Sequence, residues 1–279
     1  MPPPRDEHIQ DKAAPPGSSL YYALRFLPAD QRHALTTFTA FVREVRGILE
    51  NVTDAGVANT KLAWWRTEIQ RAYDGQTQHP TLQALAPHLQ AAAIDARLLL
   101  AIVEGTRIDA EQNRFFDYEG LRHYGEHASG IPAEVAARLL GHTHDDTLRA
   151  AHGLGLALTL TGVIRDAGRH AAQGRLYLPV DEMQRFGVKA QDVLQRRSSP
   201  EFQALMQFQA ERALRTFDDA IALLPAADRR AQKPGLILAR IARTLLAEIA
   251  RSDYAVLEQR IALTPLRKFW LAWRTQALG

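Results

Sequence analysis

The stretch Gly153–Pro179, GLGLALTLTGVIRDAGRHAAQGRLYLP, decides how the rest of the chain is interpreted. Its first twelve residues carry no charge, so a helix formed here is buried on nearly every side. This apolar run is too short to span a bilayer. Charged residues follow at helical spacing, so Asp166 can meet Arg169 and His170 on one face. Arg165 is predicted to lie beside Arg169, and the helix therefore carries charges into the interior.

The bulk composition favours one large helical domain. The chain has 279 residues, of which 46% are hydrophobic, enough to build a substantial core. Apolar residues recur at helical spacing, and few stretches show the alternation of apolar and polar residues that is typical of strands. We therefore predict a single all-α domain over residues 18–279. Residues 1–17 contain five prolines among charged residues and are predicted to form a disordered N-terminal tail.

Charge and cysteine content restrict the classes of partner. The net charge is +3 and the pI is about 9.3, which suits phosphate-bearing ligands or an anionic membrane face. No basic block interleaved with aromatics and no zinc-finger or RNA-binding motif occurs, so nucleic acid is not expected as a partner. The absence of cysteine excludes disulfides and thiol catalysis. The N-terminal residues lack the apolar core of a signal peptide. We therefore expect a cytoplasmic protein, with peripheral contact at the inner membrane face as an alternative.

Four motifs follow one another along the chain. They are Ser18-Ser19 with Tyr21-Tyr22-Ala23 and Phe26-Leu27-Pro28, then Phe41-Val42-Arg43-Glu44-Val45, then Lys61-Leu62-Ala63-Trp64-Trp65-Arg66, and finally TGVIRDAGRHAAQGRLYLP. Together they resemble the squalene/phytoene synthases, which join two isoprenoid diphosphates head to head, and the resemblance runs from about Ser18 to Trp273. It implies an isoprenoid-synthase-type helical bundle around a central cavity.

The resemblance also implies carboxylates on two facing helices that hold Mg²⁺ against the substrate diphosphates. In the first motif those positions fall on Arg46, Gly47, Glu50 and Asn51. In the second, Asp166 is followed by Arg169 and His170, and the preceding amide positions fall on Thr159 and Gly162. Glu50 and Asp166 are thus the surviving acids. Magnesium prefers several hard oxygen ligands and a guanidinium repels it, so no metal site is predicted with the residues present.

Ten residues are candidates for binding the diphosphate or lining the cavity, and no catalytic residue is assigned. They are Ser19, Tyr21, Arg43, Arg46, Glu50, Tyr124, Arg165, Asp166, Arg169 and Tyr177. Ser18 or Ser19 can simply cap a helix through Phe26, or its helix start can offer backbone donors to an anion. Arg46 and Glu50 stand four apart, which predicts a surface ion pair unless this face lines a cavity. Asp109 matches an acidic position that is frequent in the family.

Two further clusters have an interpretation from spacing alone. His123 and His127 have the spacing of two zinc ligands on a helix, but no third ligand follows. Asp145 or Asp146 is predicted to cap the helix that begins near Leu148.

The last helix starts at Pro265 and mixes aromatic and basic residues. Phe269, Trp270 and Trp273 sit beside three cations, Arg267, Lys268 and Arg274. We prefer core packing for the aromatics, and docking on lipid is the alternative.

Three functions remain open from the sequence. The first is an active head-to-head prenyltransferase that condenses farnesyl or geranylgeranyl diphosphate with Mg²⁺, and with NADPH for a squalene-type reaction. The second is a relative that holds an isoprenoid or other lipid phosphate without Mg²⁺, using arginines as direct phosphate partners: Arg43, Arg46, Arg165 and Arg169. The third is a non-catalytic scaffold with a protein partner, as for a respiratory complex I assembly factor of the same family.

We prefer a squalene/phytoene-synthase-like protein of squalene, hopanoid or carotenoid metabolism whose Mg²⁺-dependent prenyl transfer is weakened or lost. A large open cavity with inward arginines favours ligand binding. A cavity filled by side chains favours a scaffold.

Overall fold

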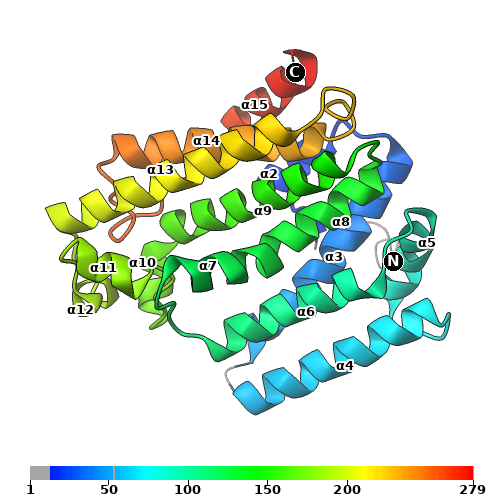
Figure 1. Ribbon diagram of the computed structural model, residues 1–279, viewed down its shortest axis with the longest axis horizontal. Helices are drawn as coiled ribbons and strands as arrows, with labels where there is room; N and C mark the ends of the chain where they lie inside the picture. Colours follow the sequence, from blue (N-terminus) through cyan, green and yellow to red (C-terminus); the bar gives the residue numbers. More distant parts are fainter. Residues whose placement is uncertain (1–12, 53, 279) are drawn as a thin grey trace.

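A computed structural model describes residues 13–52 and 54–278, which form a helical bundle (Figure 1). The described residues contain no strand, which confirms the predicted all-α single domain. The helices are α2 (Ser19–Leu24), α3 (Ala29–Asn51), α4 (Ala55–Tyr73), α5 (Pro80–Ala91), α6 (Ala96–Glu111), α7 (Tyr118–Gly125), the π-helix η1 (Glu126–Gly130), α8 (Ile131–Leu140), α9 (Asp145–Arg165), α10 (Ala167–Ala172), α11 (Val180–Arg185), α12 (Ala190–Leu194), α13 (Pro200–Leu223), α14 (Lys233–Arg251) and α15 (Pro265–Leu278).

Helix α9 is the centre of the bundle, as its apolar sequence predicts. It packs against α13 and α14 on one side and against α7, η1 and α8 on the other (Figure 1). Of the helices within the described ranges, only α9 is long and apolar enough to cross a membrane, and 67% of its most apolar window is buried inside the bundle. That burial is what a core helix requires.

Glycine allows η1 to touch α9 backbone to backbone. A Cβ added to Gly155 would lie 2.1 Å from the carbonyl oxygen of Ser129, and one added to Gly125 would lie 2.7 Å from Leu156. Because side chains cannot fit there, the wall formed by η1 lies close against the central helix.

The predicted N-terminal tail is only partly described. Residues 1–12 lie outside the described residues. Residues 13–17 pack onto the domain: Ala13 and Ala14 are buried, and Lys268 donates to the Gly17 carbonyl at 3.1 Å. The ordered domain therefore begins a few residues before the predicted boundary at residue 18. Ser18, not Ser19, caps α2 by accepting from the backbone N–H of Tyr21 at 3.1 Å.

The start of α9 is capped by a residue more than eighty positions away in the sequence. Asp228 is buried, and its carboxylate accepts from Thr143 N at 2.9 Å, from His144 N at 3.2 Å and from the hydroxyls of Thr143 and Thr147. The predicted cap by Asp145 or Asp146 is wrong, because both lie inside the first turn. Burial by itself raises the pKa of Asp228, but the hydrogen bonds from Thr147, Thr143 and His144 outweigh it and hold the pKa well below its usual range.

We expect Asp228→Ala to lower the free energy of unfolding by about 2–4 kcal/mol at pH 7, because several buried donors lose a charged acceptor. In the wild type this contribution is complete above the usual carboxyl pKa of about 4 and is lost as the pH falls below it. Urea unfolding at pH 7 and pH 3 measures both effects. Asp219→Ala, an exposed aspartate on α13, is the control. Equal stability of the two variants at pH 7 would contradict this account.

Candidate functional site

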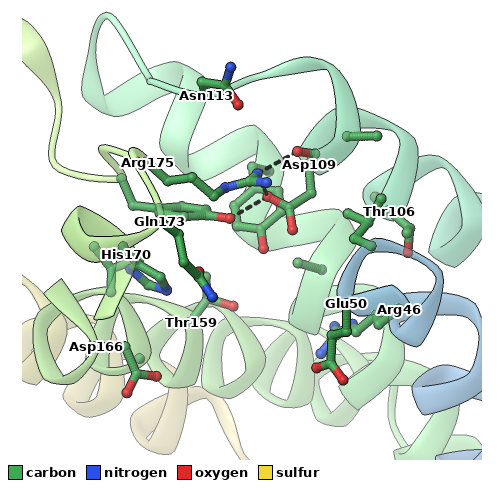
Figure 2. A pocket seen from close by; sticks show the side chains of 18 of the residues that line it. Arg46, Glu50, Thr106, Asp109, Asn113, Thr159, Asp166, His170, Gln173 and Arg175 are labelled. Carbon is green, nitrogen blue, oxygen red and sulfur yellow. Dashed lines mark hydrogen bonds and ion pairs between the residues drawn. The ribbon is translucent and has the colours of Figure 1, made fainter. Parts of the chain in front are cut away.

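A cavity of about 870 Å³ opens between α3, α6, α9, α10 and the turn after α10 (Figure 2). Each wall contributes polar side chains: Arg46 and Glu50 from α3, Thr106 and Asp109 from α6, Thr159 from α9, His170 from α10, and Arg175 and Tyr177 from the turn. Apolar residues fill the spaces between them, including Leu49, Leu158 and Val163. The cavity is therefore mixed in character and is not filled by its own side chains.

The turn after α10 is fixed against the loop between α6 and α7. The N–H of Leu176 donates to the Asn113 carbonyl at 2.9 Å, and that of Val180 donates to the Phe115 carbonyl at 3.0 Å. Gly174 begins the turn with φ +71°, a conformation that favours glycine. These contacts place the turn's side chains in the cavity wall.

Asp109 is held by two residues of this turn. The guanidinium of Arg175 forms an ion pair with its carboxylate at 2.5 Å, and the hydroxyl of Tyr177 donates to the same oxygen (Figure 2). Burial first, and the negative charge of Asp109 second, raise the pKa of Tyr177 well above its usual value, so its hydroxyl stays protonated and continues to donate. Asp109 is therefore a paired carboxylate.

Asp166 stands at the junction between α9 and α10 and is also paired. It is buried and accepts from Arg165 Nε at 3.0 Å, from Arg165 Nη2, and from Arg169 Nη2 at 3.1 Å. Burial by itself raises the pKa of this carboxyl group. The hydrogen bonds and charges of the two arginines outweigh burial and lower the pKa. The predicted pairing with Arg169 is confirmed, whereas the second partner is Arg165 and not the His170 ring.

Arg46 and Glu50 face the cavity lumen from α3 (Figure 2). Within the described part of the chain neither forms a hydrogen bond or an ion pair, so the predicted Arg46–Glu50 surface pair is not formed. Arg46 is accessible from the lumen but surrounded by protein. Desolvation lowers the pKa of its guanidinium, against the opposing effects of Tyr124 and Asp109. Arginine nevertheless remains charged at neutral pH. The side chain is exposed to the lumen, so an anion that enters the cavity can reach its guanidinium.

Three buried polar atoms at the opposite end of the cavity have no partner among the described residues. They are Thr159 Oγ1, His170 Nδ1 and Arg175 Nε. The His170 ring packs on Tyr177 with centroids 4.3 Å apart. Burial, followed by the charge of Arg169, lowers the pKa of His170 to about 4, so the imidazole is neutral at pH 7. All three residues line the cavity, but these atoms are themselves shielded from solvent.

The residues present do not fit a cluster of magnesium ions. Across residues 13–52 and 54–278, no three Asp, Glu or His side chains converge on a common point. Asp109 and Asp166 are occupied by arginines, and only Glu50 of the motif acids is unpaired there. Space is not the obstacle, because a Cβ added to Gly47 or Gly162 would meet nothing within 4 Å. His123 and His127 stack with centroids 4.5 Å apart and also lack a third ligand among the described side chains.

The structure brings together six of the ten candidate residues around this cavity. They are Arg46, Glu50, Tyr124, Asp166, Arg169 and Tyr177. Arg165 reaches the site through Asp166. Tyr21 instead lines a separate hollow of about 460 Å³ and accepts from Arg25 at 2.9 Å, so the expected grouping with the main cavity is wrong for it. Neither Ser19 nor the exposed Arg43 lines the main cavity. The roles of all ten in binding stay predictions.

Arg175, Gln173 and Asn113 line the cavity but were absent from the predicted set. Arg175 had a detectable signal, since it belongs to the turn motif that carries the resemblance. Gln173 lies within the same motif, whereas Asn113 had no signal, because only the docking of the turn on the α6–α7 loop brings it to the wall.

Comparison with known proteins identifies the family. The squalene/phytoene synthase profile matches residues 13–267. The chain belongs to the squalene/phytoene synthase family. It is 28% identical over 257 residues to the phytoene synthase of Mycobacterium tuberculosis, an alignment that covers 91% of this chain and 84% of that enzyme.

Two solved structures share the fold. The squalene synthase HpnC from Alicyclobacillus acidocaldarius aligns with a TM-score of 0.79 and 22% identity, covering 89% of this chain and 92% of that one. A dehydrosqualene synthase in complex with a ligand aligns with a TM-score of 0.80 and 21% identity over 97% of both chains. The family is that of prenyltransferases, which normally use Mg²⁺ and bind isoprenoid diphosphates.

We expect the imidazole of His170 to titrate near pH 4, because burial and Arg169 disfavour its charged form. NMR titration of the ten histidines, with His170 assigned from its absence in His170→Gln, measures the midpoint. Because this folded pKa lies below the unfolded value of about 6.5, stability should fall as the pH decreases from about 6.5 toward 4, and fall less in His170→Gln. A midpoint near 6.5 would contradict this description of the site.

Proposed function

We propose that this member of the squalene/phytoene synthase family holds an isoprenoid phosphate in the central cavity without a magnesium cluster, and that its Mg²⁺-dependent prenyl transfer is weakened or lost. The observation that carries the proposal is the charge distribution of the cavity. The half-buried Asp109 and the buried Asp166 are paired with arginines, while Arg46 faces the lumen without an ion pair to any described residue.

An open cavity supports ligand binding over a purely structural role. Its volume of about 870 Å³ lies within the range of roughly 300–1,000 Å³ that is usual for small-molecule sites. An open cavity with Arg46 exposed at its lumen, and without an ion pair to any described residue, suits an anionic ligand better than a scaffold role.

The ligand's chemistry follows from the two kinds of wall. Leu49, Leu158 and Val163 offer apolar surface to an isoprenoid chain. Arg46 offers a charged fork that suits two phosphate oxygens. At the far end Thr159, His170 and Arg175 add polar side chains to the wall. This supports a place in squalene, hopanoid or carotenoid metabolism, and the relatives named above are a phytoene synthase and a squalene synthase.

The same charge distribution explains why prenyl transfer is weakened or lost. Ionising a diphosphate requires that the departing negative charge be neutralised, and in the family Mg²⁺ does this. In this chain the cations next to Asp166 are already engaged with it. Arg46 alone can bind a phosphate without matching a metal cluster as an electrophile, so binding is retained better than catalysis.

We expect farnesyl diphosphate to bind in the presence of EDTA, and Arg46→Gln to weaken that binding by about tenfold or more, because one charge-assisted hydrogen-bonding group is lost. Isothermal titration calorimetry measures the dissociation constant with and without Mg²⁺. Arg240→Gln, an exposed arginine on α14, is the matched control and should leave the affinity unchanged.

Two outcomes would contradict the proposal. One is equal affinity of the Arg46→Gln and Arg240→Gln variants. The other is presqualene diphosphate or squalene, detected by mass spectrometry after incubation with farnesyl diphosphate, Mg²⁺ and NADPH, at a rate that falls in Asp166→Asn.

A further inference from the structure

The outward face of α15 is apolar. Leu266, Trp270 and Trp273 recur at the spacing of one helical face, and 76%, 49% and 52% of each residue's surface is exposed. Phe269 flanks them and is 38% exposed, and its ring is tilted against that of Tyr22 with centroids 6.0 Å apart. The preferred prediction that these aromatics pack in the core is therefore wrong. The inward face of α15 is supplied instead by Leu271 and Ala272, which are buried.

The charges of α15 have a single sign. Arg267, Lys268 and Arg274 give the helix a formal charge of +3, and it contains no aspartate or glutamate. Lys268 points inward to the Gly17 carbonyl, and Arg267 pairs with Glu248 at 2.6 Å. Arg274 lies over the Trp270 ring at 5.3 Å, so it borders the exposed aromatic face. Cations beside half-exposed tryptophans are typical of helices that lie in a membrane interface.

This charge pattern decides between possible occupants. A symmetric contact with a second copy would place the Arg274 side chains of both copies in one apolar interface without an acidic partner from either α15, which is unfavourable. An anionic bilayer offers negative headgroups to Arg274 and an interfacial layer to the tryptophans at the same time. We propose that the face formed by Leu266, Phe269, Trp270, Trp273 and Arg274 docks on the surface of an anionic phospholipid bilayer.

This inference is independent of what the cavity binds. α15 and the cavity lie on different parts of the bundle, and none of the residues of the proposed face lines the cavity (Figure 1). The docking surface would hold the protein where long-chain lipids are available, without itself forming part of the binding site.

Sedimentation of the full-length protein with vesicles tests the proposal. The vesicles contain phosphatidylcholine alone or phosphatidylcholine mixed with phosphatidylglycerol. We expect binding to the anionic vesicles that weakens as salt is added. The double variant Trp270→Ser/Trp273→Ser should reduce the partition coefficient by about tenfold or more. Arg274→Gln should reduce it by about fivefold.

Trp64→Ser is the matched control. Trp64 is 47% exposed, close to the value for Trp270, but it lies on α4 at the opposite side of the bundle from α15 (Figure 1). It should bind vesicles like the wild type, and circular dichroism should show that all variants remain folded. Failure of the wild type to bind anionic vesicles would overturn the proposal, as would unchanged binding by the double variant. A wild-type dimer in analytical ultracentrifugation that the double variant loses, without vesicle binding, would assign the face to a second copy.

Discussion

A buried carboxylate at the end of the central helix is the constraint on which the site depends. Asp166 follows the last turn of α9, where the negative end of the helix dipole opposes another negative charge, and the N-terminus of the short helix α10 offsets part of this effect. Burial adds a further cost, so Asp166 is stable as an anion only with cations beside it. Arg165 and Arg169 meet that need from the same segment. The position that keeps the family's acid has thereby become an internal ion cluster.

The same solution recurs on the facing wall. Asp109 is paired with Arg175 and accepts from Tyr177, and this pairing joins α6 to the turn after α10. Two carboxylates and their arginines therefore stiffen the cavity instead of offering oxygens to a cation. Arg46 and Glu50 are the charged motif residues that face the lumen without an ion pair to a described residue. Under our proposal the guanidinium of Arg46 binds the phosphate of the ligand directly.

The sequence predicted those features that depend on local pattern. The burial of α9, the Asp166–Arg169 contact and the helical class follow from spacing over a few turns. The order of the four motifs along the chain indicated the family. Contacts between distant segments were not accessible in this way. Asp228 caps a helix more than eighty residues earlier, and no local signal distinguishes it from Asp145 or Asp146, which stand at the helix start.

In the candidate site, too, the motifs indicated some residues, whereas the positions of others depend on tertiary packing. Arg46 and Tyr177 line the cavity, and each belongs to a motif that carries the resemblance, Arg46 on α3 and Tyr177 in the turn after α10. Tyr21 lines a different hollow, because the direction of the short helix α2 depends on its packing against α14 and α15. The exposure of the α15 aromatics was also missed. An amphipathic pattern identifies an apolar face without stating whether protein or solvent lies against it.

The most direct test of the central claim is a crystal structure of the protein grown with farnesyl thiodiphosphate and Mn²⁺, with anomalous diffraction recorded to locate manganese. The account predicts phosphate oxygens within hydrogen-bonding distance of Arg46 and no anomalous peak between Glu50 and Asp166. A cluster of manganese ions bridging those two carboxylates and the diphosphate, with Arg165 and Arg169 displaced from Asp166, would contradict it.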